Sequence, residues 1–173
     1  FFCAGLAFLP TGELVLLGGS SEHKEMLLLD ADTKELRSLP GMSFSRFYPT
    51  LVPLADGTIA VGSGNGVVKP FELRNPATGG WTTLPDSVRN VTYGYAALHL
   101  LPGGEIFNTA AGNFTPPDGH AGILRIKDNT GSWEESDQFV VPTRGQASVI
   151  LRVDDSGAKP TAEIMAFGGS GAG

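Results

Sequence analysis

The stretch Leu9-Pro10-Thr11-Gly12-Glu13-Leu14-Val15-Leu16-Leu17-Gly18-Gly19 joins a glycine turn to a short apolar strand. The chain repeats this arrangement as Leu54-Ala55-Asp56-Gly57-Thr58-Ile59-Ala60-Val61-Gly62, as Leu101-Pro102-Gly103-Gly104-Glu105-Ile106-Phe107, and in a weaker copy over residues 155–169. The turn glycines, at positions 12, 57, 104 and 157, are 45, 47 and 53 residues apart. Trp81 and Trp133 recur at a similar spacing, 52 residues. Two independent markers therefore divide the chain into repeats of about 50 residues.

Each repeat predicts four short strands. In the second repeat they cover residues 48–54, 58–61, 68–74 and 81–84, with turn-forming Asp, Asn, Pro and Gly between them. Four strands per repeat, with a Trp near the fourth, are typical of a kelch-type β-propeller blade. The rival is a meandering β-sandwich whose spacing is accidental. We favour the propeller.

The repeats predict an all-β protein with one partial propeller domain over residues 1–173. The blades lie at about 1–40, 44–85, 92–140 and 145–173. Because propellers usually close with at least four blades, three blades and part of a fourth are expected to be a fragment of a larger ring.

Composition excludes several classes of function. Charged residues make up 17% of the chain, which disfavours long surface helices, and 41% apolar residues can supply a core. The net charge of -6 argues against nucleic acid or an anionic membrane as a partner. No apolar run approaches the length of a membrane span. A single cysteine permits no internal disulfide.

Equal positions in successive repeats group a thiol with phenols. The first strand of each propeller blade lies nearest the central axis. Counting nine residues back from each turn glycine gives Cys3, Tyr48 and Tyr95, and, less securely because its turn is longer, Ser148. These residues could simply fill space, since free Cys often behaves as a small buried hydrophobe.

The segments around two of these residues resemble the copper radical oxidases, the family of galactose oxidase and glyoxal oxidase. The similar segments here are Phe2-Cys3-Ala4-Gly5 on one repeat and Arg46-Phe47-Tyr48 on the next. In that family such segments supply a cross-linked Tyr-Cys cofactor. Tyr93-Gly94-Tyr95, before Leu100-Leu101-Pro102-Gly103-Gly104, is similar to the glyoxal oxidase branch. At the level of blades the resemblance covers nearly the whole chain.

The resemblance implies that Cys3 and Tyr48 form a thioether cofactor and that Tyr48 is a copper ligand. An ordinary phenol has a pKa near 10 and gives up an electron reluctantly, whereas an ortho thioether makes its oxidation easier. Cu(II) accepts nitrogen and oxygen donors. The implied reaction oxidises small aldehydes, primary alcohols or sugars and reduces O2 to hydrogen peroxide. Arg46, Tyr93 and Tyr95 are possible pocket residues, although an arginine placed like Arg46 or Arg144 more often caps backbone carbonyls.

The chain departs from the family pattern at the other copper ligands. It has no match for the family's Tyr-His pair, and we interpret His99 as a strand histidine rather than a ligand. The remaining ligands are therefore expected on later blades. The sequons Asn90-Val91-Thr92 and Asn113-Phe114-Thr115 agree with an extracellular, secreted protein. The alternative is a non-catalytic kelch propeller that binds a protein or a glycan.

Overall fold

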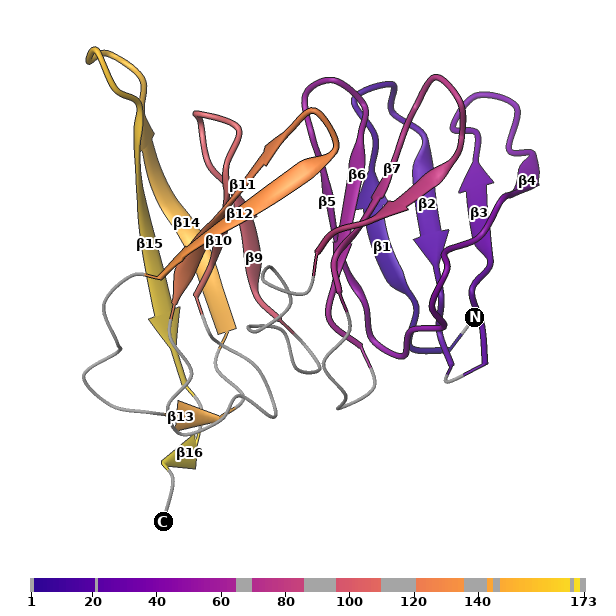
Figure 1. The fold of residues 1–173 in the computed structure, drawn as a ribbon, viewed down its shortest axis with the longest axis horizontal. Coiled ribbons are helices and arrows are strands. Elements are labelled where there is room, and N and C mark those ends of the chain that lie inside the picture. Colours follow the sequence, from indigo (N-terminus) through magenta and orange to yellow (C-terminus); the bar gives the residue numbers. More distant parts are fainter. Residues whose placement is uncertain are drawn as a thin grey trace.

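The fold is built from antiparallel strands. The computed structural model describes residues 2–20, 22–64, 70–85, 96–109, 121–135, 143–144, 147–168 and 170–171. Every regular element in these ranges is a strand, which confirms the all-β prediction. In the same ranges, no helix is long and apolar enough to cross a membrane. The sheets stand side by side in chain order (Figure 1).

Three sheets are four-stranded meanders, which we number as blades 1 to 3. Blade 1 contains β1 (Gly5–Phe8), β2 (Leu14–Leu17), β3 (Met26–Leu29) and β4 (Leu36–Leu39). Blade 2 contains β5 (Thr50–Pro53), β6 (Ile59–Gly62), β7 (Glu72–Arg74) and β8 (Trp81–Thr83). Blade 3 contains β9 (Leu98–Leu100), β10 (Ile106–Asn108), β11 (Gly122–Lys127) and β12 (Thr130–Glu135).

The last part of the chain, which we call blade 4, forms two strand pairs. The long strands β14 (Ala147–Asp154) and β15 (Thr161–Phe167) pair antiparallel, and β13 (Thr143–Arg144) pairs with β16 (Ser170–Gly171). The strands observed in blade 2 overlap all four strands predicted for the second repeat. The repeat pattern therefore located the hairpins as well as the fold class.

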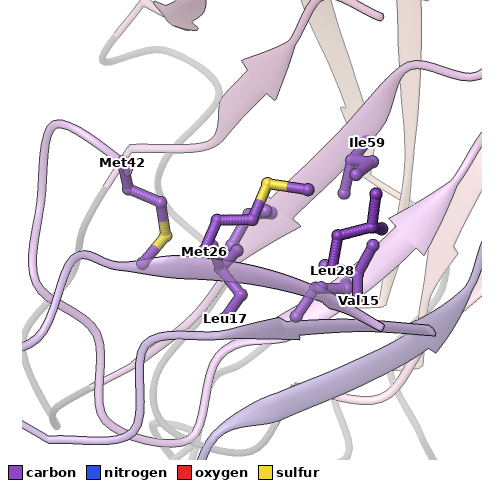
Figure 2. Close-up of a cluster of buried hydrophobic side chains, with 8 residues drawn as sticks. Val15, Leu17, Met26, Leu28, Met42 and Ile59 are labelled. Atoms are coloured by element: carbon purple, nitrogen blue, oxygen red, sulfur yellow. The ribbon is translucent and has the colours of Figure 1, made fainter. Parts of the chain in front are cut away.

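Blade 2 is buried on both faces because side chains alternate along its strands. On β6, Ile59 and Val61 pack towards blade 1, while Ala60 packs towards blade 3. The first core includes blade 1 side chains from β2 and β3 (Figure 2), among them Val15, Leu17, Met26 and Leu28. The second core joins Val52, Phe71 and Leu73 of blade 2 to Ile106 and Leu124 of blade 3.

The two tryptophans that marked the repeat have equivalent places. Trp81 on β8 packs against the core between blades 1 and 2, and Trp133 on β12 packs against the core between blades 2 and 3. The indole Nε1 of Trp81 also donates to the Pro40 carbonyl at 2.9 Å. Each Trp therefore helps to attach its blade to the preceding one, which explains its recurrence.

The first and last blades each present apolar side chains to solvent. In blade 1, Leu6 and Phe8 are 61% and 70% exposed. In blade 4, the exposed apolar residues are Val149, Leu151, Val153, Met165 and Phe167. Because blade 2 buries the corresponding faces against its neighbours, these exposed faces agree with a ring of blades that extends further at both ends.

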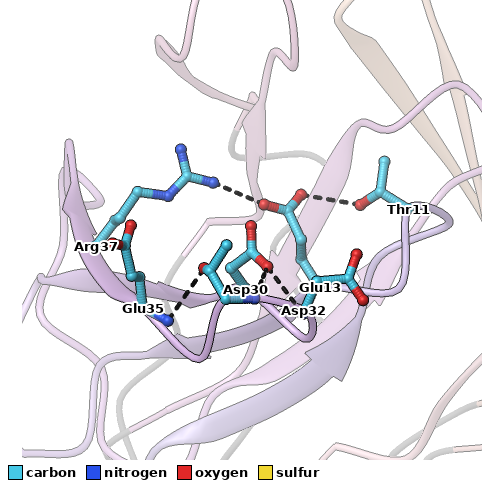
Figure 3. A network of polar contacts seen from close by, with 7 residues as sticks. Thr11, Glu13, Asp30, Asp32, Glu35 and Arg37 are labelled. Carbon is cyan, nitrogen blue, oxygen red and sulfur yellow. Dashed lines mark hydrogen bonds and ion pairs between the residues drawn. The ribbon is translucent and has the colours of Figure 1, made fainter.

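The turns of blade 1 carry an exposed polar network (Figure 3). Glu13 pairs with Arg37 at 2.8 Å and accepts a hydrogen bond from Thr11 at 2.9 Å. Asp30 accepts the backbone N–H of Thr33 at 2.9 Å, and this bond is the largest cause of the lowered pKa of Asp30. Exposed pairs of this kind contribute little to stability, so the network shapes the turns rather than holding the blades together.

A polar contact joins blades 3 and 4. His99 Nε2 on β9 lies 2.7 Å from Ser148 Oγ on β14, and Thr109 Oγ1 lies 3.3 Å from the same hydroxyl. Partial burial lowers the pKa of His99. The structure thus agrees with the interpretation of His99 as a strand histidine satisfied by a neighbouring blade.

Removing a side chain from the core between blades 2 and 3 should destabilise the fold strongly. Leu73 is 1% exposed, so Leu73→Ala should lower the free energy of unfolding by about 2 to 5 kcal/mol. Its cross-strand partner Thr82 is exposed, so Thr82→Ala should change it by less than about 0.5 kcal/mol. Urea unfolding followed by fluorescence measures both, and equal effects would contradict the two-sided burial of blade 2.

The partial burial of His99 should make stability depend on pH. Since burial lowers the pKa of His99, the unfolded chain takes up a proton more readily than the folded one. The stabilisation is therefore complete above the ordinary histidine pKa of about 6.5 and is lost as the pH falls below it. As the pH is lowered through that range, the melting temperature should fall less steeply in His99→Gln than in the wild type. His23→Gln is the control for the loss of one histidine. If it changed the dependence of melting temperature on pH as much as His99→Gln does, the assignment to His99 would be contradicted.

Candidate functional site

Cys3 and Tyr48 occupy the same backbone position in successive blades. Each lies two residues before the first strand of its blade. We call the residues that lead into that strand the entry segment of the blade: residues 2–4 in blade 1, 43–49 in blade 2 and, among the described residues, 96–97 in blade 3. Their φ angles are 63° and 57°, in the left-handed region that side chains other than Gly rarely adopt. This shared conformation is independent structural support for the repeat count that grouped the thiol with the phenol.

The two residues are also neighbours in space. The backbone N–H of Tyr48 donates to the carbonyl of Cys3 at 2.9 Å. Cys3 is a free thiol, and both side chains are half-buried. The ring of Phe47 meets that of Tyr48 edge-on, with centroids 4.2 Å apart. The structure therefore brings together the entry segments that carry the thiol and the phenol.

Arg46 lies two residues before Tyr48 and has no exposed surface. Its Nε and Nη2 donate to Glu72 Oε2 at 3.2 and 3.0 Å, and its Nη1 donates to the Ser63 carbonyl at 2.6 Å. Nη2 also donates to the carbonyl of Pro70. Of the two uses that the sequence leaves open for Arg46, these contacts are those of carbonyl capping. Burial lowers the pKa of Arg46, and the Glu72 carboxylate opposes that shift.

Glu72 is the site residue that the sequence analysis missed. Its side chain is fully buried on β7, and its Oε1 also accepts the backbone N–H of Ser43 at 2.6 Å. A signal was available, because Glu72 stands between Phe71 and Leu73 within a predicted strand. A carboxylate buried among such neighbours requires a cation or several donors. The sequence does not say which of the twelve Lys and Arg residues supplies it.

The strand register shows that Ser148 does not occupy the repeat position of Cys3, where counting from the turn glycine had placed it. Gly5 pairs with Leu17, just before Gly18, and Ala147 pairs with Phe167, just before Gly168. Ala147 thus corresponds to Gly5, and Ser148 lies within β14 rather than before it. Counting from the turn glycine fails here because β14 and β15 are long and their register shifts after Ile150.

Several predicted residues lie outside the described ranges. They are Tyr93, Tyr95 and both sequons, and the side chain of Arg144 is likewise outside them. His23 is described, and its exposed ring pairs with Glu25 at 2.9 Å. Within the described ranges, no three His, Cys, Asp or Glu side chains are grouped so as to hold a metal. The site described so far is therefore a thiol and a phenol in adjacent entry segments.

Comparison with known proteins supplies a sequence relationship. No protein-family model matches the chain. Two curated galactose oxidases, one from Gibberella zeae and one from its strain PH-1, are each 30% identical to it over 93 residues. The match covers 51% of this chain and 14% of each galactose oxidase. The chain therefore spans a small part of the length of these relatives.

A solved structure extends the likeness to the whole chain. A fungal alcohol oxidase of the AA5 family, determined in complex with copper, superposes with a TM-score of 0.67 at 17% identity. The superposition covers 98% of this chain and 42% of that chain. It shows a shared fold, and it confirms the fold class predicted from the repeats. The chain is thus similar to galactose oxidase in sequence over about half of its length, and it shares the fold of the alcohol oxidase over nearly all of it.

Proposed function

We propose that this chain is the part of a copper radical oxidase that supplies the Tyr-Cys half of its active site. The observation that carries the proposal is the hydrogen bond from Tyr48 N–H to the Cys3 carbonyl, between two residues of identical backbone position. The sequence match to galactose oxidase supports the same assignment.

The donor chemistry of these residues fits one side of a copper site. A phenolate oxygen is a donor that Cu(II) accepts, and Tyr48 carries the phenol next to the entry segment of Cys3. We assign Tyr48 as a copper ligand and expect nitrogen ligands from blades beyond the described residues. When bound, copper supplies an acceptor for one electron beside the phenolate.

The role of Cys3 is to modify the phenol. A bond forms between Cys3 Sγ and the ring carbon next to the Tyr48 hydroxyl, while the S–H and that C–H bond break. The two protons and two electrons released reduce O2 to hydrogen peroxide. The sulfur then shares electron density with the ring, which makes Tyr48 easier to oxidise. The half-buried position of both side chains leaves them reachable from solvent while limiting exposure.

The substrate proposed is a small aldehyde, a primary alcohol or a sugar, with O2 as the electron acceptor. The curated relatives are galactose oxidases and the structural neighbour is an alcohol oxidase. The Arg46-Phe47-Tyr48 and Tyr93-Gly94-Tyr95 segments favour an enzyme of the glyoxal oxidase type. The sequons fit a secreted protein, so we propose an extracellular oxidase.

The cross-link gives a direct test. After copper and air are added to the full-length protein, its intact mass should fall by about two hydrogens. A peptide containing Cys3 should then remain joined to one containing Tyr48 after digestion. Tyr48→Phe removes the phenol, so Cys3 should keep a thiol that reacts with an alkylating reagent.

Tyr95→Phe is the matched control, because it removes the phenol at the same repeat position in the next blade. It should retain the cross-link whatever its turnover. A wild-type Cys3 that is alkylated normally after copper and air would remove the oxidase assignment. A propeller that binds a protein or glycan through its loops would then be the better description.

A further inference from the structure

We propose that the buried pair of Arg46 and Glu72 is a positioning device that holds Tyr48 against Cys3 for formation of the cross-link. This inference rests on the proposed function, because it assigns a purpose to contacts around that same site. Neither residue is placed in contact with copper or substrate. Their effect is transmitted through the backbone, since Arg46 belongs to the same entry segment as Tyr48.

The side chain of Arg46 fastens this segment inside blade 2. The planar guanidinium reaches the carbonyls of Ser63 and Pro70, on the connection between β6 and β7, as well as the Glu72 carboxylate. Glu72 returns to the same segment through its bond from Ser43 N–H. A planar guanidinium has several N–H donors in fixed directions, which suits this set of acceptors. A lysine ammonium is a compact point charge and does not offer that arrangement.

The main chain of Arg46 fastens the same segment to blade 1. Its N–H donates to the His23 carbonyl at 3.2 Å, and its carbonyl accepts the N–H of Gly19 at 3.0 Å. Gly18, with φ of 67°, permits this approach, because a Cβ there would lie 2.5 Å from the Arg46 carbonyl oxygen. The residue that anchors the Tyr48 segment thus also ties it to the blade that carries Cys3.

The same set of contacts extends to blade 3. Ser63, whose carbonyl accepts from Arg46, uses its Oγ to accept the N–H of Ala96 at 3.3 Å. Thr50, at the start of β5, donates to the Ala96 carbonyl at 2.7 Å. Ala96 precedes β9, as part of the entry segment of blade 3. The guanidinium and its acceptor Ser63 therefore connect the entry segments of blades 2 and 3. The main chain of Arg46 adds the connection between β2 and β3 of blade 1.

Such positioning is needed because the backbone of Tyr48 is strained. A φ of 57° is sparsely populated for a tyrosine and persists where surrounding contacts over-determine it. Bond formation between two side chains depends steeply on their relative placement, and a displacement of about 1 Å can cost a hundredfold in rate. A buried ion pair is weak evidence for stability alone, so its use here is better explained by orientation.

The first test measures the rate of cross-linking in the full-length protein under conditions in which every variant is folded. Arg46→Lys keeps a positive charge beside Glu72 but loses the planar guanidinium. Glu72→Gln keeps the size and shape of the side chain but loses its negative charge. Both should slow the loss of the Cys3 thiol after copper and air by about tenfold to a hundredfold. Leu73→Ala, next to Glu72 in the core, is the control for lowered thermal stability and should cross-link at the wild-type rate.

A second test needs no copper, so it separates this inference from the proposed function. In Tyr48→Cys, the new thiol and Cys3 can form a disulfide with oxidised glutathione, which is reduced to two glutathione molecules. Because a disulfide demands a narrow geometry, its rate of formation reports how the two positions are held. Adding Arg46→Lys should slow it by about tenfold or more, whereas adding Leu73→Ala should not.

The outcomes separate the two ideas. If wild type fails to cross-link but Arg46→Lys still slows the disulfide, the proposed function falls and the positioning role stands. If Arg46→Lys and Glu72→Gln leave both rates unchanged, or Leu73→Ala slows them equally, the positioning role is overturned. Should Glu72→Gln not fold, Arg46→Lys decides the question, and should neither fold, the pair is structural and the inference is wrong.

Discussion

A backbone hydrogen bond from Tyr48 to Cys3 joins the first two blades beside their first strands. One such bond contributes about 1 kcal/mol net, which is too little to align two sheets. The apolar core behind it supplies the larger free energy, since Ile59 and Val61 pack into blade 1 while Ala60 faces blade 3. The core sets the distance between blades, and the hydrogen bond sets which residues of the entry segments face each other. Blade packing therefore brings the two entry segments within reach of each other.

The two kinds of ion pair in this chain have different uses. Arg37 and Glu13 meet on the surface, where solvent screens their charges, so breaking this ion pair costs little free energy. Arg46 and Glu72 meet without solvent. Removing one buried partner leaves an uncompensated charge, which costs far more than the pair itself contributes. A buried pair is thus poorly suited to adding stability and well suited to enforcing one arrangement of the backbone.

Much of the fold and part of the site could be predicted from the sequence. The turn glycines and the two tryptophans gave the blades because a repeated structure leaves a repeated pattern. Cys3 and Tyr48 were grouped by the same count, and their similar φ angles agree with that grouping. Ser148 was misplaced because the register shift after Ile150 breaks the count. Glu72 was missed because pairing across 26 residues depends on how the chain folds back, which local pattern does not encode.

The left-handed backbone at Cys3 and Tyr48 bears on how this protein could be engineered. At such angles Gly and Asn are tolerated better than a thiol-bearing or aromatic residue. Selection of random variants for heat resistance alone would therefore favour Gly or Asn at both positions, which removes the proposed cross-link without harming the fold. A screen for a more heat-resistant variant would therefore have to follow the proposed cross-link together with the melting temperature.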